Sequence, residues 1–246
     1  MSGSLAILDG CGGIGRVLVA EAGLGDYDVH VIDLPRSTTA HPPDTAHPPD
    51  VPAIPADATS ETDLADATKA LPSDLVGLVN LSVFMADNRS VADTGAETWN
   101  EVLTGNLIMS YAVARALKSK LCKEASFAMT GSGLGHFARL GYGPYAVAKA
   151  GVAAMTRQLA LELAPDVRVN CVAPSAVDTA FPRDGTGRSK EDQEMGLDLE
   201  VYARAIPKGQ VAEPADITGP ILFLLSGASR YMTGQVLHVN GGTFMS

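Results

Sequence analysis

The strongest indication of the fold is the stretch LAILDGCGGIGRVLVAEA, residues 5–22. Its first four residues are apolar and predict a short buried strand, and a helical periodicity follows the glycines at once. Gly10, Gly12 and Gly15 have the spacing G-x-G-x-x-G. Glycines allow a tight turn that approaches a pyrophosphate, and the helix N-terminus offers free N–H groups and a positive dipole end. The stretch therefore predicts a dinucleotide-binding turn between the first strand and the first helix.

Strand and helix patterns alternate along the rest of the chain. Apolar runs rich in Val and Ile predict strands at Leu5–Leu8, Val29–Ile32, Leu75–Val79, Ser126–Met129, Val167–Val172 and Val236–Val239. Helical patterns lie at Ile14–Ala22, Thr98–Lys118, Tyr145–Ala164 and Ala215–Leu225. Strands buried on both faces and joined by helices indicate an α/β fold with a doubly wound parallel sheet. The length of 246 residues suits one unit, so we expect residues 1–246 to form a single domain.

Two segments interrupt this alternation. Residues 39–50 read TAHPPDTAHPPD, and the paired prolines of this repeat exclude a regular helix. We therefore expect a surface loop with little or no helix between the second and third strands. His41 and His47 have no third ligand nearby, so we expect no metal site there. Residues 181–210 are polar and unusually long for a connection, and we expect them to form a substrate lid with a short helix near Leu197–Ala205.

The composition argues against several classes of function. The sequence has 28 acidic and 18 basic residues, and a net charge of -10 does not suit a nucleic-acid or anionic-membrane partner. No run approaches the roughly 20 apolar residues of a membrane helix, and the N-terminus lacks the basic start of a signal peptide. Cys11, Cys122 and Cys171 are odd in number and lack metal-binding spacing. We expect reduced thiols, a cytoplasmic location and no metal.

The residue that ends the second strand bears on the choice of cofactor. Asp33 follows the glycine turn by about 20 residues, where an acidic side chain binds the adenosine ribose hydroxyls. A carboxylate at this place repels the additional phosphate of NADP. We therefore expect NAD in preference to NADP, although the charge of Arg36 acts in the opposite direction.

Tyr145 and Lys149 are the candidate acid/base pair. They are four positions apart on a predicted helix, so their side chains lie on one face, one turn apart. A free tyrosine has a pKa of about 10, too high for a base at neutral pH. A nearby ammonium lowers that pKa, and an oxidised nicotinamide adds a second positive charge. The pair therefore predicts proton transfer to or from a carbinol or carbonyl oxygen.

With these motifs, the chain resembles the short-chain dehydrogenase/reductase family over nearly its whole length. Members of that family have a Rossmann fold. The resemblance rests on the glycine turn, Asp33, Asp57, Asn106, Ser132, Tyr145-x-x-x-Lys149, NCVAPSAVDT at 170–179 and YMTGQVLHVNGG at 231–242. Ser132 precedes Tyr145 by thirteen positions, which is the family spacing of the catalytic serine.

The resemblance implies a role for each matching residue. Tyr145 would be the general acid/base, Lys149 would lower its pKa and hold the nicotinamide ribose, and Ser132 would hydrogen-bond the substrate oxygen. Asn106 would hold a water in a proton relay. The cofactor would be bound by Gly10, Gly12, Gly13, Ile14 and Gly15 in the turn, by Asp33, Asp57, Ala58, Asn80, Pro174, Val177 and Thr179 at later strand ends, and by Tyr145 and Lys149.

Tyr142 offers an alternative to Tyr145. Six residues separate it from Lys149, a spacing found in the related enoyl-thioester reductases, which reduce a carbon–carbon double bond. Three features favour Tyr145: the position of Ser132, the short glycine turn, and the glycines on both sides of Tyr142, which should keep it off the helix.

Some family positions are altered. The family's usual glycine turn is Thr-Gly-x-x-x-Gly-x-Gly, and the turn in this chain is one residue shorter, with Asp9 before Gly10. After the fourth strand the family usually has Asn-Asn-Ala-Gly, and this chain has Asn80-Leu81-Ser82-Val83 instead. These changes keep open a second alternative, a dinucleotide-binding sensor without catalysis. The complete set of catalytic residues argues against it, since a binding protein has no need of them.

The sequence thus predicts an enzyme that transfers hydride between NAD and a small secondary alcohol or ketone, cyclic or of medium length. His136, Phe137, Leu140 and Tyr142 would line one wall of its site. The family implies a homotetramer (or a dimer), and the apolar segment Val236–Met245 suits a subunit interface. Cys11 lies beside a helix N-terminus, where we expect a lowered thiol pKa.

Overall fold

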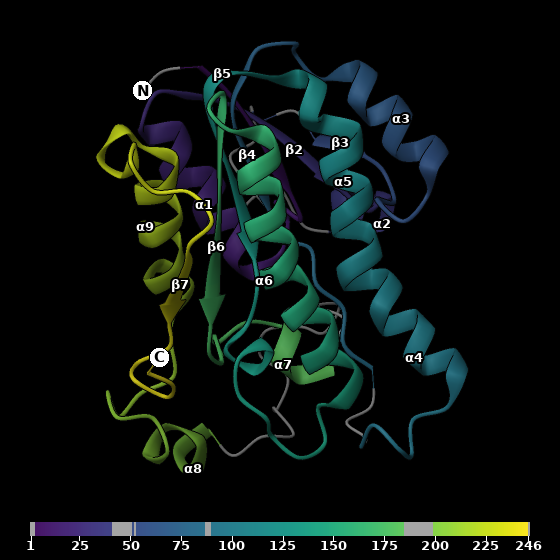
Figure 1. The fold of residues 1–246 in the computed structure, drawn as a ribbon, viewed down its shortest axis with the longest axis vertical. Coiled ribbons are helices and arrows are strands. Elements are labelled where there is room, and N and C mark those ends of the chain that lie inside the picture. Colours follow the sequence, from purple (N-terminus) through teal and green to yellow (C-terminus); the bar gives the residue numbers. More distant parts are fainter. Residues whose placement is uncertain (1–2, 41–50, 52, 87–89, 185–198, 246) are drawn as a thin grey trace.

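The structure is a computed structural model that describes residues 3–40, 51, 53–86, 90–184 and 199–245. Its centre is one sheet of seven parallel strands in the order β3-β2-β1-β4-β5-β6-β7 (Figure 1). The strands are β1 (Gly3–Leu8), β2 (Tyr27–Asp33), β3 (Ala53–Pro55), β4 (Leu75–Asn80), β5 (Leu121–Thr130), β6 (Val167–Pro174) and β7 (Val236–Val239). The predicted doubly wound parallel sheet is confirmed.

Helices cover both faces of this sheet. They are α1 (Gly13–Leu24), α2 (Pro35–Ala40), α3 (Glu61–Ala70), α4 (Ala96–Leu103), α5 (Met109–Leu117), α6 (Gly143–Leu163), α7 (Phe181–Asp184), α8 (Leu199–Arg204) and α9 (Pro214–Leu225). A π-helical turn, Thr104–Ile108, joins α4 to α5, so the long helix predicted over Thr98–Lys118 is one continuous rod with a widened turn. Among the helices that the structure describes, none has the length and hydropathy needed to span a bilayer.

Three differences from the prediction concern connections. Thr39 and Ala40, expected in the repeat loop, form the end of α2, and residues 41–50 lie outside the described part of the chain. Helix α3 was not predicted, although Ser60 begins it by accepting a hydrogen bond from the Asp63 N–H at 3.2 Å. In the predicted lid, α8 matches the expected short helix and α7 precedes it, while residues 185–198 are outside the described part.

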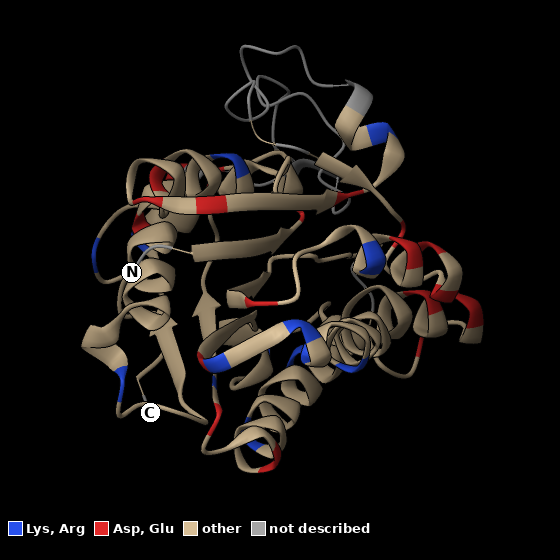
Figure 2. Ribbon diagram, turned by 90° about the horizontal axis from the view of Figure 1, so that it is seen from above, with Lys and Arg blue, Asp and Glu red and all other residues tan. Residues whose placement is uncertain are grey.

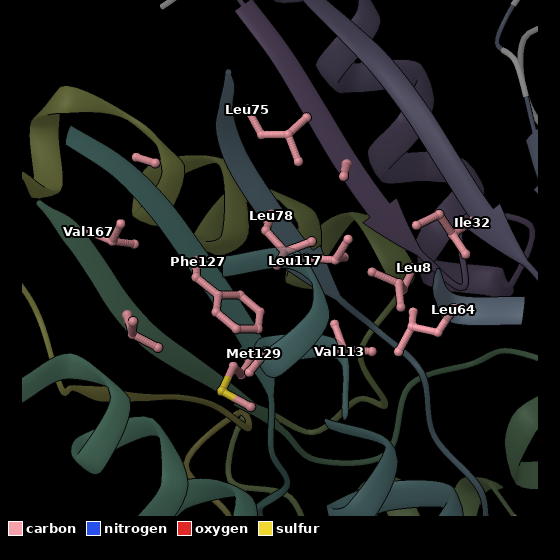
Figure 3. Close-up of a cluster of buried hydrophobic side chains, with 14 of the residues drawn as sticks. Leu8, Ile32, Leu64, Leu75, Leu78, Val113, Leu117, Phe127, Met129 and Val167 are labelled. Atoms are coloured by element: carbon pink, nitrogen blue, oxygen red, sulfur yellow. The ribbon is translucent and has the colours of Figure 1, made fainter. Parts of the chain in front are cut away.

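The core consists of two layers, one on each face of the sheet. Neighbouring strand residues point to opposite faces, so Leu78 and Phe127 pack toward α3, α5 and α6, whereas Val79 and Ala128 pack toward α1 and α9. Charged residues lie mostly on the flanking helices and loops, and the middle strands are largely uncharged (Figure 2). In Figure 3, Phe127 lies between Leu78 and Met129 in the first layer. This double-sided burial holds the strand ends in place.

The strand order determines where a ligand site can form. From β1 the chain moves outward to β2 and β3, and then returns to place β4 on the other side of β1. Helices that follow β1 and β4 therefore lie on opposite faces and leave a crevice beyond the carboxyl ends of these two strands. Such reversal points are where open α/β sheets bind their ligands.

Candidate active site

A cleft opens at this reversal point, beyond the carboxyl ends of β1, β4, β5 and β6. It encloses about 1150 Å³, including space that is open to solvent. The lining comes from every segment that leaves these strands: Asp9, Gly13, Ile14, Leu81, Val83, Met85, Thr130–Leu134, Phe137, Tyr142, Tyr145, Pro174–Val177, Thr179, Phe181, Pro182, Tyr202, Asn240 and Thr243. The turn, the candidate acid/base and the predicted lid therefore meet in one place.

The glycine turn forms the floor of the cleft at the start of α1. A Cβ atom on Gly13 would lie 2.6 Å from the Thr179 methyl carbon, and one on Gly15 would lie 2.0 Å from the Asp9 carbonyl oxygen. Gly12 precedes the helix, which has no side-chain cap and no acidic residue in its first turn. Its first N–H groups are therefore available to an anion. The turn fits the pyrophosphate of a dinucleotide.

Asp33 supports this turn from the end of β2. Its carboxylate is buried and accepts hydrogen bonds from the backbone N–H groups of Cys11, at 2.9 Å, and Leu34, at 2.7 Å. The Cys11 thiol is also buried, and burial together with Asp33 raises its pKa to about 12. The expectation of a lowered thiol pKa at Cys11 is wrong, because desolvation and a neighbouring carboxylate outweigh the helix dipole.

The structure brings only some of the predicted cofactor residues to the cleft. Gly13, Ile14, Pro174, Val177, Thr179 and Tyr145 line it. Gly10, Gly12 and Gly15 shape the turn instead, and Asp33 supports it from behind. Ala58 packs against the core, and Asp57 accepts hydrogen bonds from the Thr59 N–H and hydroxyl at 2.9 and 2.7 Å, which helps to begin α3. Asn80 is buried beneath the cleft and donates to the Ser110 hydroxyl at 3.2 Å.

Ser132 and Tyr145 lie on one wall of the cleft, and Lys149 is buried beside Tyr145. Tyr145 is buried near the start of α6, and its side chain is hydrogen-bonded to that of Ser132, just beyond β5. Lys149 follows one turn later, with Nζ 5.7 Å from the centre of the Tyr145 ring. That ammonium donates to the Thr130 carbonyl at 3.0 Å, which fixes its position. The three side chains that the sequence placed together are therefore neighbours.

Burial has the largest effect on the pKa of both Tyr145 and Lys149. Desolvation raises the pKa of Tyr145, and the hydrogen bond from Ser132 only partly opposes it. Desolvation also lowers the pKa of Lys149 to about 8, against the charges of Cys171 and Asp9. The sequence led us to expect that Lys149 lowers the pKa of Tyr145. In this structure the stronger effect of burial leaves Tyr145 as a proton donor.

Asn106 does not reach the cleft. It is fully buried in the π-helical turn, and its side-chain amide donates to the Phe84 carbonyl at 2.6 Å and to the Val102 carbonyl at 2.8 Å. Its carbonyl oxygen accepts the Phe84 N–H at 3.3 Å. These bonds attach the segment after β4, which contains the cleft residues Val83 and Met85, to the helix rod. In this structure Asn106 positions a wall of the cleft.

The predicted substrate wall is partly correct. Phe137 and Tyr142 line the cleft, and Tyr142 precedes the first residue of α6 as expected. Leu140 is 96% exposed and is not among the residues that line the cleft, so the structure does not place it in the wall. His136 turns instead toward the C-terminal segment, with its ring centre 4.6 Å from that of His238. Burial lowers the pKa of both imidazoles, which keeps them neutral in this aromatic cluster.

Several cleft residues were not identified as site residues from the sequence. Leu81 and Val83 stand where the family has Asn and Gly, Phe181 and Tyr202 come from the predicted lid, and Asn240 and Thr243 come from the C-terminal segment. The sequence signal for the last two was the family-like ending at 231–242. In the described residues, no group of three or more His, Cys, Asp or Glu side chains could hold a metal ion.

Comparison with known proteins agrees with this geometry. A family model described as enoyl-(acyl carrier protein) reductase matches residues 10–243. The 3-oxoacyl-(acyl-carrier-protein) reductase FabG of Vibrio harveyi is 33% identical over 171 residues, which are 68% of this chain and 66%, just under two thirds, of that relative. The protein of the same name from Vibrio cholerae is 30% identical over 193 residues, or 76% of this chain and 75% of the relative.

Solved structures show the same fold. A short-chain dehydrogenase family protein from Francisella tularensis has a TM-score of 0.80 and 26% identity, with 99% of each chain covered. A short-chain dehydrogenase/reductase from Brucella melitensis has a TM-score of 0.86 at 23% identity, covering 99% of this chain and 97% of that one. The sheet, the cleft and these matches together show that the chain belongs to the short-chain dehydrogenase/reductase family of oxidoreductases.

Proposed function

We propose that the protein transfers hydride between a nicotinamide dinucleotide and the carbinol or carbonyl carbon of a small secondary alcohol or ketone. One observation carries the proposal. Tyr145 is buried in a cleft that also contains the glycine turn, and it is hydrogen-bonded to Ser132, with Lys149 one helical turn away. An acid, an oxygen-binding hydroxyl and a cation beside a dinucleotide turn are the parts that this reaction requires.

In this mechanism the bound cofactor supplies or accepts the hydride. The N–H groups at the start of α1 would hold the pyrophosphate, and the segment containing Val177 and Thr179 would hold the nicotinamide end. Ser132 would donate a hydrogen bond to the substrate oxygen and stabilise its developing charge. Tyr145 would donate its phenolic proton to that oxygen in reduction and accept it in oxidation. Because burial raises the pKa of Tyr145, its phenol carries in the free protein the proton that ketone reduction consumes.

The lining of the cleft supports an apolar substrate with a ketone. Leu81, Val83, Met85, Phe137 and Phe181 provide aliphatic and aromatic walls around the acid/base. The relatives named above are reductases of 3-oxoacyl chains, whose ketone lies two carbons from a thioester. We therefore place 3-oxoacyl thioesters beside cyclic and medium-length ketones as the first substrates to test.

A reduction of a carbon–carbon double bond through Tyr142 is the second candidate. The description of the matching family model favours it, and Tyr142 lies in the cleft near Tyr145. Against it, the hydrogen bond to Ser132 belongs to Tyr145. Tyr142 also stands before α6 rather than one turn from Lys149 on the same helix face. The ketone reaction is therefore the one we propose.

The remaining parts of the proposal concern the cofactor and the assembly. We favour NAD over NADP on the position of Asp33 in the sequence, because a carboxylate at the end of β2 would repel the additional phosphate of NADP. We also propose a cytoplasmic enzyme that acts as a homotetramer, or as a dimer.

The test is a screen of the purified protein by reduced-cofactor absorbance. A panel of 3-oxoacyl thioesters, cyclic ketones, secondary alcohols and 2-enoyl thioesters is offered with NAD(H) and NADP(H) in parallel. Turnover of a ketone or alcohol would support the proposal, and turnover of 2-enoyl thioesters alone would support the second candidate. Binding of NADH without turnover of any compound would instead favour a sensor.

A further inference from the structure

Asp9 is the one acidic side chain of the glycine turn that faces the cleft. It follows the last residue of β1, and its φ of 60° lies in the left-handed region that favours glycine. A Cβ atom on Gly12 would lie 3.0 Å from both Asp9 carboxyl oxygens. The carboxyl group thus lies close to Gly12, the residue that precedes α1. The first N–H groups of that helix, which are available to a phosphate, begin at the next residue.

The surroundings of Asp9 do not compensate a negative charge well. Among the described residues, the structure gives its carboxyl oxygens no hydrogen-bond donor. The titratable groups that act on it are the Asp33 carboxylate at the end of β2, the Cys11 thiol of the same turn and the Lys149 ammonium of α6. Burial and the charge of Asp33 raise the pKa of Asp9 above its ordinary value, and only Lys149 acts in the opposite direction. Because the side chain remains partly exposed at the cleft, water moderates this rise until a ligand covers it.

A pyrophosphate at this turn would bring two negative charges to the Asp9 carboxyl. An ionised Asp9 would repel them in a site where water is largely displaced, which strengthens the repulsion. A protonated carboxyl would instead donate a hydrogen bond to a phosphate oxygen.

We propose that Asp9 must carry a proton for the dinucleotide to bind, so that cofactor binding takes up a proton from solution wherever Asp9 is ionised in the free protein. The inference rests on the proposed function only in requiring that the cleft binds a nicotinamide dinucleotide. Its consequence follows from linkage, since a ligand that binds only the protonated form loses affinity by about tenfold for each pH unit above the pKa of that group. Asp9 would then make cofactor affinity depend on pH, a property that the usual threonine before the first glycine would not confer.

The test is the dissociation constant for NADH, measured by fluorescence between pH 5.5 and 9 for the wild-type protein, Asp9→Asn and Asp9→Gly. Asparagine keeps the shape without the charge and tolerates the left-handed conformation, while glycine removes the side chain and suits that conformation best. Calorimetry in two buffers that differ in ionisation enthalpy gives the number of protons taken up. The Asp9 charge raises the pKa of Lys149, so Lys149 loses its own charge at a lower pH in both variants. That loss would weaken dinucleotide binding at high pH, which is opposite to the gain expected from removing the Asp9 charge, so a gain in affinity still reports on Asp9.

We expect NADH affinity of the wild-type protein to fall with rising pH and to be accompanied by proton uptake. Both variants should bind at least about tenfold more tightly than wild type at pH 9 and take up fewer protons. The inference is overturned if the wild-type protein and both variants bind with the same pH dependence. If none of the three binds NADH or NADPH at any pH, the proposed function itself fails. Either variant is sufficient should the other not fold.

Discussion

At the scale of single residues, the proposed chemistry depends on the Tyr145 proton. Because burial raises its pKa, the phenol holds its proton in the cleft. Replacing Tyr145 with Phe removes that proton and keeps the ring that packs 6.4 Å from Phe181. We expect Tyr145→Phe to lower kcat at least about 100-fold, the usual contribution of a positioned acid/base. Steady-state kinetics with the best substrate of the screen measures the effect.

Tyr142→Phe is the matched control for this variant. It removes a hydroxyl from the same cleft while leaving the bond between Ser132 and Tyr145 intact, so kcat should stay within a few-fold of wild type. NADH binding should be nearly unchanged in both variants. A large loss of kcat in Tyr142→Phe together with a small loss in Tyr145→Phe would reverse the assignment and support reduction of a double bond.

Lys149 gives a second prediction, on the pH dependence of the reaction. Burial lowers its pKa to about 8, so the ammonium is present below that pH and is lost above it. If that cation stabilises the phenolate that Tyr145 leaves behind, kcat/KM for ketone reduction should be level below pH 8 and fall as the pH rises above it. Measuring at saturating NADH separates this effect from any change in cofactor binding.

Lys149→Arg tests the cause of this decline. A guanidinium keeps its charge throughout this pH range, so the decline above pH 8 should disappear even if the overall rate is lower. A wild-type profile that stays level to pH 9.5 would show that the Lys149 charge does not control the rate.

At the scale of elements, Arg139 connects the predicted lid to the wall of the cleft. Its guanidinium lies 5.0 Å from the ring centre of Tyr202 in α8 and 5.9 Å from that of Tyr142. Both rings line the cleft, so the arginine holds α8 against the mouth of the site. Exposed contacts between a cation and an aromatic ring contribute about 0.5–1 kcal/mol each. We expect Arg139→Ala to raise the KM of the ketone roughly 3- to 10-fold and to leave kcat nearly unchanged.

Three further variants make this expectation specific to the ring contacts. Arg139→Lys keeps a cation above both rings and should retain most of the affinity for the ketone. Tyr202→Phe keeps the aromatic face and should behave like wild type, whereas Tyr202→Leu should resemble Arg139→Ala. Equal KM values in wild type and Arg139→Ala would show that α8 is held by other contacts.

The elements also show what could be predicted from the sequence. Six of the seven strands and the long helices were predicted because burial on both faces leaves continuous apolar runs and a helical periodicity, whereas the short β3 has no buried residue and was not. The π-helical turn was not predicted, since it depends on the bonds between Asn106 and the distant Phe84. Helix α3 was missed because few of its residues are buried, among them Leu64 and Ala67. Such elements are determined by tertiary contacts and capping more than by hydrophobic pattern.

The same distinction applies to the candidate site. Ser132, Tyr145 and Lys149 could be placed together because their helix and strand end impose the distances. Asp57 was assigned to the cofactor, and one oxygen of its carboxylate accepts hydrogen bonds in the local turn that begins α3, so its role at the cofactor stays a prediction. Leu140 was assigned to the wall, but nothing in a loop sequence fixes the direction of a side chain. Positions within regular elements were therefore predicted better than those in connections.

At the scale of the whole molecule, one layer of helices leaves apolar side chains uncovered. Ile108 and Tyr111 on the rod of residues 104–117 are 53% and 52% exposed, and Val147 and Leu161 on α6 are 45% and 78% exposed. These two elements pack against each other, so the four side chains lie on neighbouring helices (Figure 1). Exposed apolar side chains that gather on one layer are typical of subunit interfaces. The position of these four residues therefore supports the proposed homotetramer or dimer, and it is stronger support than the apolar C-terminal segment alone.

The oligomer can be tested by light scattering after gel filtration. We expect the wild-type protein to have two or four times the chain mass of 25.5 kDa, and the double variant Tyr111→Asp and Val147→Asp to dissociate, because each interface would bury unpaired charges. Leu24→Asp is the control: Leu24 is 88% exposed on α1, which covers the opposite face of the sheet, so its charge should leave the mass unchanged. A wild-type mass of one chain would exclude the assembly, and dissociation by Leu24→Asp would place the interface on the α1 face instead.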